Sequence, residues 1–192
     1  MKIKVIKVSQ PAVILLLFSA IIVVSGCKRK IDSKVTPQTK PTTQMPFGSE
    51  NDLALADSLW AIISDEEVGY LTWNSWDEAR VEMYEGQSPH GAFLKTYVSP
   101  NASGSSNGIP LGAIIVKENY TEDKTLGPLT IMWRIKDYDP DNFDWFWAKY
   151  LPDGKVDKNA KGVKLAGRVA KGMDVGCISC HGDAGKELVF TN

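Results

Sequence analysis

The order of apolar and polar positions predicts one helix followed by several β-strands. Between residues 51 and 65, leucine and isoleucine recur at helical spacing, and Asn51 or Asp52 is placed to cap the helix. Beyond residue 90 the pattern changes to short runs rich in β-branched and aromatic residues, which are typical of strands. The predicted strands cover residues 92–98, 111–120, 129–136 and 145–150.

Turn-forming residues separate these elements. Residues 101–108 are rich in serine, glycine and asparagine, residues 152–154 read Pro-Asp-Gly, and residues 161–172 are rich in glycine and lysine. A short final helix is expected to begin at the paired cysteines near the C-terminus. Strands in succession with helices at either end predict an α+β fold, built on an antiparallel β-sheet with flanking helices.

The N-terminal stretch is predicted to be a targeting signal. Lysines at positions 2, 4 and 7 precede an apolar run that ends in Val-Ser-Gly-Cys at Cys27. The run is shorter than a usual membrane span, and its end resembles the lipobox of bacterial lipoproteins. That resemblance implies a signal peptide over residues 1–26 and lipidation of Cys27. An uncleaved transmembrane anchor is the alternative. Both interpretations place the rest of the chain at a membrane, facing the periplasm or the cell surface.

Charge and composition divide the remaining chain in two. Residues 27–51 have almost no large apolar side chains and are predicted to form a flexible tether, whereas residues 52–192 form the globular domain. From Asn51 onward the chain has 14 Lys and Arg against 21 Asp and Glu, a net charge of −7. Such an acidic domain is unsuited to nucleic acid and suits a basic redox partner protein or a small substrate.

The densest chemical signal is the C-x-x-C-H motif formed by Cys177, Cys180 and His181. In an exported protein this motif is typical of covalent haem c attachment. The two thiols form thioethers with the haem vinyl groups, and His181, the next residue, can ligate the iron from the proximal side. One motif predicts one haem, held by the expected C-terminal helix.

Three other interpretations of the motif stay open at this point. A disulfide between Cys177 and Cys180 would suit an oxidising compartment, although it would not need the histidine. A zinc site needs four ligands, and only His90 and carboxylates remain to complete it. A thioredoxin-like redox pair would expect a βαβ context, which the strand pattern does not provide.

The sixth coordination position of the iron would decide between electron transfer and ligand chemistry. Candidate sixth ligands are His90, Met83, Met132 and Met173. His90 lies in a Ser-Pro-His-Gly turn, where a histidine is more often a surface or hydrogen-bonding residue than a ligand. Mid-strand methionines more often fill a core, so an open sixth position is expected.

Two lysines interrupt otherwise apolar strand faces. Alternation puts Lys117 on the same face as Ile115 and puts Glu118 on the opposite face. Lys95 shares its face with Phe93 in the same way. Because burying an ammonium group is costly, each lysine either reaches water or serves a buried group such as a haem.

These features follow one another in the order seen in a known family. The domain resembles the cytochrome P-460 family, which includes the cytochromes c′-beta. The C-x-x-C-H motif alone is general to c-type cytochromes, whereas the ordered set is specific and spans most of the chain after the tether. The matching pieces are Ser-Pro-His-Gly-Ala-Phe-Leu-Lys-Thr-Tyr at 88–97, Gly-Ala-Ile-Ile-Val-Lys-Glu-Asn-Tyr at 112–120, Tyr-Asp-Pro at 138–140, Asp-Trp-Phe-Trp-Ala-Lys-Tyr at 144–150, the motif at 177–181 and Val-Phe at 189–190.

The resemblance implies a β-rich fold, a homodimer and one haem whose iron faces an open distal pocket. In hydroxylamine-oxidising members a strand lysine is bonded to the haem edge, and Lys117 matches that lysine. Lys95 falls where the family often has a basic pocket residue, and Phe93 falls where aromatic packing is common. These three residues therefore join Cys177 and Cys180 as candidate haem-binding residues.

The oxidising members also use a distal carboxylate as proton acceptor, which no motif identifies in this chain. Asp174, just before the C-x-x-C-H motif, is a candidate, whereas Glu118 should point away from Lys117. The expected protein is a lipid-anchored monohaem cytochrome that oxidises or binds a small nitrogen ligand, hydroxylamine or nitric oxide. Nitric oxide binding without turnover and electron transfer by a six-coordinate haem are the alternatives, so an enzymatic activity is left open.

Overall fold

A computed structural model describes residues 47–190 except residues 106, 174 and 185–186. It has an α+β fold with one six-stranded antiparallel sheet in the order β1-β2-β3-β4-β5-β6, so each strand pairs with its neighbours in sequence. This confirms the predicted fold class. The elements are α1 (Glu50–Ile63), β1 (Tyr84–Glu85), β2 (Phe93–Val98), β3 (Ile114–Tyr120), β4 (Leu126–Arg134), β5 (Trp145–Tyr150), β6 (Ala166–Gly167) and α2 (Cys177–His181), with 3₁₀ turns η1 (Tyr70–Thr72), η2 (Trp76–Glu78) and η3 (Pro140–Asn142).

Helix α1 begins slightly earlier than predicted because its cap is Ser49. The Ser49 hydroxyl accepts a hydrogen bond from the backbone N–H of Asp52, and the Asp52 carboxylate accepts one from the backbone N–H of Ser49. This reciprocal pair is a capping box. The prediction that Asn51 or Asp52 caps the helix was therefore wrong by two or three residues, since Asp52 occupies the third helical position.

The longer strands lie close to their predicted positions, and the differences have local causes. Strand β3 begins at Ile114, because Gly112 just before it adopts a left-handed conformation (φ 82°) that any other residue would resist. Strand β5 matches its prediction. Strands β1 and β6 were not predicted, since two residues are too short to show an alternation.

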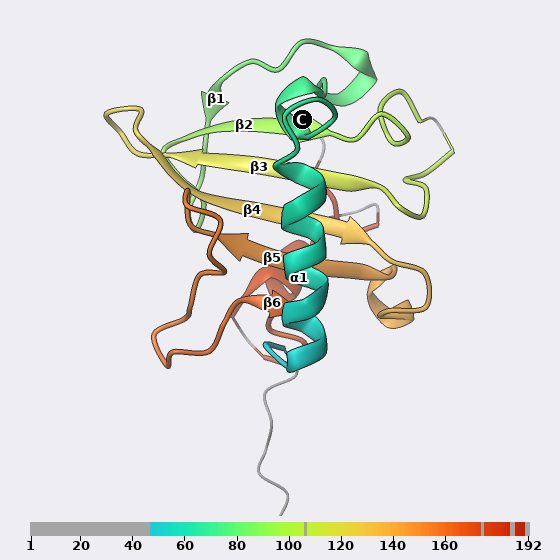
Figure 1. Ribbon diagram of the computed structural model, residues 1–192, viewed down its shortest axis with the longest axis vertical. Helices are drawn as coiled ribbons and strands as arrows, with labels where there is room; N and C mark the ends of the chain where they lie inside the picture. Colours follow the sequence, from blue (N-terminus) through green and yellow to red (C-terminus); the bar gives the residue numbers. More distant parts are fainter. Residues whose placement is uncertain (1–46, 106, 174, 185–186, 191–192) are drawn as a thin grey trace, which may run out of the picture. The chain divides into compact units, whose positions relative to one another are not determined.

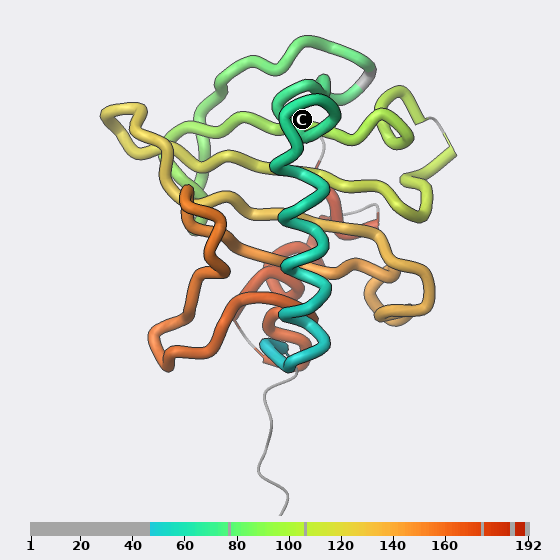
Figure 2. Tube along the Cα trace, in the orientation of Figure 1, coloured from blue at the N-terminus to red at the C-terminus, as the bar shows by residue number. Residues whose placement is uncertain are grey.

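The sheet has one apolar cluster on each side. On the first side, here the α1 face, helix α1 crosses the strands and buries Ala56, Leu59 and Ile63 (Figure 1). On the opposite side, here the α2 face, the C-terminal segment with α2 packs behind β5 and β6 (Figure 2). The members of the α2 cluster from the strands are Val98, Ile115, Met132, Trp145 and Trp147, with Ala113 just before β3, and its C-terminal members are Val169, Ile178, Leu188 and Val189.

Two predictions concern the N-terminal region. The signal peptide and Cys27 lie outside the described residues, as does the tether up to residue 46. Over the part of the chain that is described, no helix is both long and apolar enough to span a membrane.

Candidate functional site

Both motif cysteines lie on α2, and neither forms a disulfide. Cys177 packs against the apolar cluster of the α2 face, and burial raises the pKa of its thiol to about 11. Cys180 is exposed. Gly176 leads into the helix at φ 142°, and a Cβ there would come within 2.0 Å of the Ala170 side chain. A glycine is therefore required where the chain enters the motif.

The ring of His181 is held in one orientation. Its Nδ1 lies 2.7 Å from the backbone oxygen of Leu188. Because a carbonyl only accepts, Nδ1 carries the proton and Nε2 keeps a free lone pair. Trp147 and Phe190 lie edge-on to the imidazole, with ring centroids 4.8 and 5.3 Å away. Burial lowers the pKa of His181, which favours the neutral, ligand-competent ring.

A second histidine, His90, is held in the same tautomer by Asn119. The Asn119 amide nitrogen donates to the backbone oxygens of Lys117 (3.1 Å) and Pro128 (2.8 Å), so its oxygen faces His90 Nδ1 at 3.0 Å. His90 therefore donates through Nδ1 and keeps the lone pair on Nε2. Burial, assisted by the charge of Lys117, lowers the pKa of His90 to about 4.

Packing of the loop before β2 brings His90 to this place. A Cβ on Gly91 would lie 2.4 Å from the backbone oxygen of Tyr120, so only glycine allows the loop to rest on the end of β3. The ring centroids of His90 and His181 are consequently 6.3 Å apart. Sequence analysis favoured a surface or hydrogen-bonding histidine at position 90. The residue is hydrogen-bonded, but it also lies half-buried beside His181.

Lys117 lies on the α2 face, as its alternation with Glu118 predicted. Across the sheet it pairs with Thr96 on one side and Thr130 on the other, and Lys149 follows Thr130 in the same row. Burial lowers the pKa of Lys117. Within the described residues its ammonium group has no ion pair or hydrogen bond, whereas Lys149 pairs with Asp157 at 3.0 Å. The charge of Lys117 also lowers the pKa of both histidines, which places it near them.

Lys95 and Phe93 are on the other side of the sheet. Lys95 pairs in register with Glu118, and its Nζ lies 5.8 Å from the centroid of the Tyr120 ring. Phe93 lies beneath Lys124 on that side. The structure therefore brings together Lys117, His181 and the two cysteines but not Lys95 or Phe93. Alternation assigns the two residues to one face of β2, and only the register with β3 shows which face that is.

The remaining candidates have different surroundings. Met132 is buried in the cluster of the α2 face, Met83 is half-buried before β1, and Met173 is exposed. Asp174 lies outside the described residues. Glu118 points to the α1 face as predicted, where the hydroxyls of Tyr70, Tyr97 and Tyr120 donate to its carboxylate.

The α2 face also has a buried polar group without a partner. Among the described residues, the Nε1–H of Trp147, beside His181, finds no hydrogen-bond acceptor. A pocket of about 440 Å³ is lined in part by His90, Asn119, Thr130 and Lys149. Among residues whose positions are described, no group of three or more His, Cys, Asp or Glu could hold a metal ion, which gives no support to a closed zinc site.

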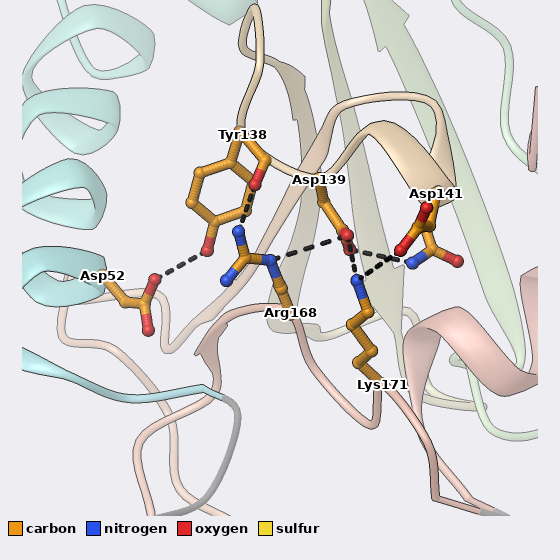
Figure 3. Close-up of polar contacts among 7 residues, drawn as sticks. Asp52, Tyr138, Asp139, Asp141, Arg168 and Lys171 are labelled. Atoms are coloured by element: carbon orange, nitrogen blue, oxygen red, sulfur yellow. Dashed lines mark hydrogen bonds and ion pairs between the residues drawn. The ribbon is translucent and has the colours of Figure 1, made fainter.

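A buried carboxylate anchors the segment that leads into α2 (Figure 3). Asp139 is 1% exposed and forms an ion pair with Lys171, while the Nε of Arg168 lies 3.6 Å away. Next to it, the Tyr138 hydroxyl donates to Asp52 of α1 at 2.6 Å. These contacts join the β4–β5 turn to both the N-terminal helix and the chain before the motif, and sequence patterns gave no signal for them.

Comparison with known proteins adds no assignment. No protein-family model matches the chain, and no curated protein matches it either.

Proposed function

We propose that the domain is a monohaem c-type cytochrome in which Cys177 and Cys180 bind the haem covalently and His181 ligates its iron. The observation that supports this most directly is the state of His181. Its Nδ1 proton is donated to Leu188, its Nε2 lone pair is free, and two unpaired thiols precede it on the same short helix. A histidine ligand typically has its second nitrogen fixed in this way by a carbonyl group.

The surroundings fit a haem as well. The α2 face combines apolar and aromatic side chains with a second imidazole lone pair and with two groups, the indole N–H of Trp147 and the ammonium group of Lys117, that have no partner among the residues described. Haem is a large apolar group with two carboxylates, so it would contact both the apolar side chains and the polar groups of this face. On the α1 face, by contrast, the carboxylate of Glu118 accepts hydrogen bonds from three tyrosine hydroxyls.

The reaction we propose is binding or oxidation of a small nitrogen ligand such as hydroxylamine or nitric oxide, as in the cytochrome P-460 family that the sequence resembles. Haem c would supply a redox-active iron able to bind that ligand. In this chain His90 can accept a proton through Nε2, and Lys117 is the residue proposed to bond to the haem edge. Asp174 stays a second candidate for the base.

One observation favours a second function, electron transfer by a six-coordinate haem. The 6.3 Å between the centroids of His90 and His181 is on the scale at which one metal ion binds a nitrogen of both rings, since metal–imidazole bonds are about 2.0–2.1 Å. His90 would then be the sixth ligand in place of an open position. Among the four methionine and histidine candidates, His90 is the one whose ring packs against His181.

Haem attachment is tested first. The protein is expressed with haem maturation and digested, and the haem-bearing peptide is weighed. We expect the peptide that contains Cys177 and Cys180 to carry one haem. If it also carries the peptide containing Lys117, the haem is cross-linked and hydroxylamine oxidation is favoured. A mature protein without haem would disprove the proposal.

The reduced spectrum then separates the two functions. A six-coordinate low-spin haem gives sharp α and β bands, and in that case His90→Ala should remove them. An open position leaves the bands broad in both proteins. For an open site, hydroxylamine-dependent reduction of a dye distinguishes an enzyme from a nitric oxide binder, because a binder loads the ligand without turnover.

We further propose that the protein is a lipoprotein on the periplasmic or outer side of a membrane, that it is a homodimer and that it exchanges electrons with a redox partner protein. The proposals on location rest on the sequence around Cys27. The mass of the mature N-terminal peptide tests lipidation directly: an acylated peptide that starts at Cys27 supports it, and a chain that still starts at Met1 contradicts it.

A further inference from the structure

We propose that the ion pair between Arg134 and Glu187 positions His181, by holding in place the backbone carbonyl that fixes the tautomer of its ring. This inference rests on the proposed function, because it concerns how the protein ligand of the haem is oriented and tuned. Neither residue of the pair is a candidate ligand, and both act through Leu188.

Glu187 is attached at three points, to strands β4 and β5 and to the loop before β3. Its Oε1 lies 2.5 Å from the Nη1 of Arg134, and its Oε2 accepts a hydrogen bond from the backbone N–H of Ile109 at 2.8 Å. Its backbone oxygen accepts a third bond from the Nε1–H of Trp145 at 2.7 Å. The two charged side chains are only 16% and 24% exposed. A pair so well enclosed and so well connected differs from an ordinary surface ion pair.

These contacts hold a backbone conformation that the sequence alone would avoid. Glu187 and Leu188 have φ angles of 50° and 62°, in the left-handed region that non-glycine residues rarely adopt. Two consecutive residues persist in this region only where the surrounding structure compels them. The result is that Leu188 is buried in the α2 cluster and turns its carbonyl toward Nδ1 of His181.

The consequence for the proposed site follows from the strength of that hydrogen bond. A carbonyl that accepts firmly from Nδ1–H makes the opposite nitrogen, Nε2, a stronger electron donor. A stronger donor stabilises the ferric state over the ferrous state. Loosening the Arg134–Glu187 pair should therefore weaken the donation by His181 and raise the reduction potential of the bound haem.

The test uses the haem-loaded protein and the variant Glu187→Gln, which keeps the shape of the side chain but removes its charge. We expect about a tenfold fall in the ratio of ferric to ferrous haem at a fixed potential, within the usual effect of an outer partner of a metal ligand. Tenfold corresponds to an upward shift of about 59 mV for one electron. The resonance Raman stretch between ferrous iron and histidine should fall in frequency.

Two further variants make the result specific. Arg134→Lys retains the charge and should give a smaller shift in the same direction, and it carries the test if Glu187→Gln does not accumulate. Asp153→Asn breaks an exposed ion pair of the same length, 2.5 Å, and should leave both readouts unchanged. A lower melting temperature with an unchanged potential and Raman frequency in the Glu187 and Arg134 variants would overturn the proposal, since the pair would then be merely structural.

A measurement on the haem-free protein separates this inference from the proposed function. The ¹⁵N chemical shifts of the His181 ring report which nitrogen carries the proton. We expect the Nδ1-protonated form in the parent protein and a mixture in Glu187→Gln. If the parent never binds haem but the tautomer still responds, the proposed function fails and the positioning does not. If haem binds and the tautomer does not respond, the proposed function stands and the positioning inference fails.

Discussion

Two neighbouring ionisable residues of β3 differ in their hydrogen-bond partners, because they lie on opposite faces of the sheet. On the α1 face Glu118 is 3% exposed, and its carboxylate receives hydrogen bonds from Tyr70, Tyr97 and Tyr120 at 2.6–3.1 Å. On the α2 face Lys117 is half-buried, and its ammonium group has no partner among the described residues. Charged groups removed from water are normally paired, so this difference is the reason why we propose the α2 face as the haem site.

The same contrast extends to the neighbours of these two residues. Burial raises the pKa of each of the three tyrosines, so each hydroxyl keeps its proton and donates it in a hydrogen bond to the carboxylate. Around Lys117 the imidazoles of His90 and His181 keep free lone pairs, and the indole N–H of Trp147 has no acceptor within the described part of the chain. The carboxylate of the α1 face is thus paired within the protein, whereas the polar groups of the proposed haem face are not.

The largest expected effect comes from breaking the cluster on the α1 face. Glu118→Ala should lower the free energy of unfolding by roughly 3 kcal/mol, because it leaves buried hydroxyl donors without an acceptor. Urea denaturation of the haem-free protein measures this. Glu118→Gln, which retains one acceptor oxygen, should lose less. An equal loss in the two variants would show that the hydroxyls do not depend on the carboxylate.

A smaller loss is expected from Asp139, which anchors the chain before α2. Asp139→Ala should cost about 2 kcal/mol, less than for a fully enclosed pair, because Lys171 and Arg168 keep partial access to water. The same denaturation experiment applies. The control Asp153→Asn, in an exposed pair, should be indistinguishable from the parent, and a control that loses as much as Asp139→Ala would contradict this account.

The pH dependence of the haem-free protein tests the burial of the histidines. An unfolded histidine has a pKa of about 6.5, while folding lowers the pKa of His90 to about 4. Between these values the unfolded state binds more protons, so stability falls as the pH falls. The slope due to His90 should approach, at most, about 1.4 kcal/mol per pH unit, reduced by solvent screening. Denaturation curves at pH 6.5 and pH 5 should therefore differ less for His90→Asn, and identical differences would refute the prediction.

The smallest effect has the opposite sign and concerns Lys117. Lys117→Met should stabilise the haem-free protein by about 1 kcal/mol, because a half-buried ammonium group without a partner among the described residues is replaced by an apolar chain of similar length. Lys149→Met, which removes a lysine from the same row but breaks its pair with Asp157, should give no such gain. Thermal unfolding of both variants makes the comparison. A destabilised Lys117→Met would mean that the ammonium group has an unrecognised partner.

Two lysines, Lys117 and Lys95, show which parts of the site could be predicted from sequence patterns. Alternation along β3 correctly separated Lys117 from Glu118, because side chains of a strand alternate whatever the strand packs against. For Lys95 the same rule gave only the residues that share its face. The register with β3, in which Lys95 pairs with Glu118, places it away from the motif.

The local features of this protein could be predicted from its sequence: the strand alternation, the α+β class, a helix close to residues 51–65 and the C-x-x-C-H motif on a short C-terminal helix. Each of these depends on residues a few positions apart, which is the range of periodicity and turn chemistry. Three relations could be seen only in the tertiary structure: His90 lies beside His181, Arg134 pairs with Glu187 next to the carbonyl that contacts His181, and Lys117 has no partner among the described residues. Those relations join residues distant in the chain, and they arise from strand register and from packing on the α2 face.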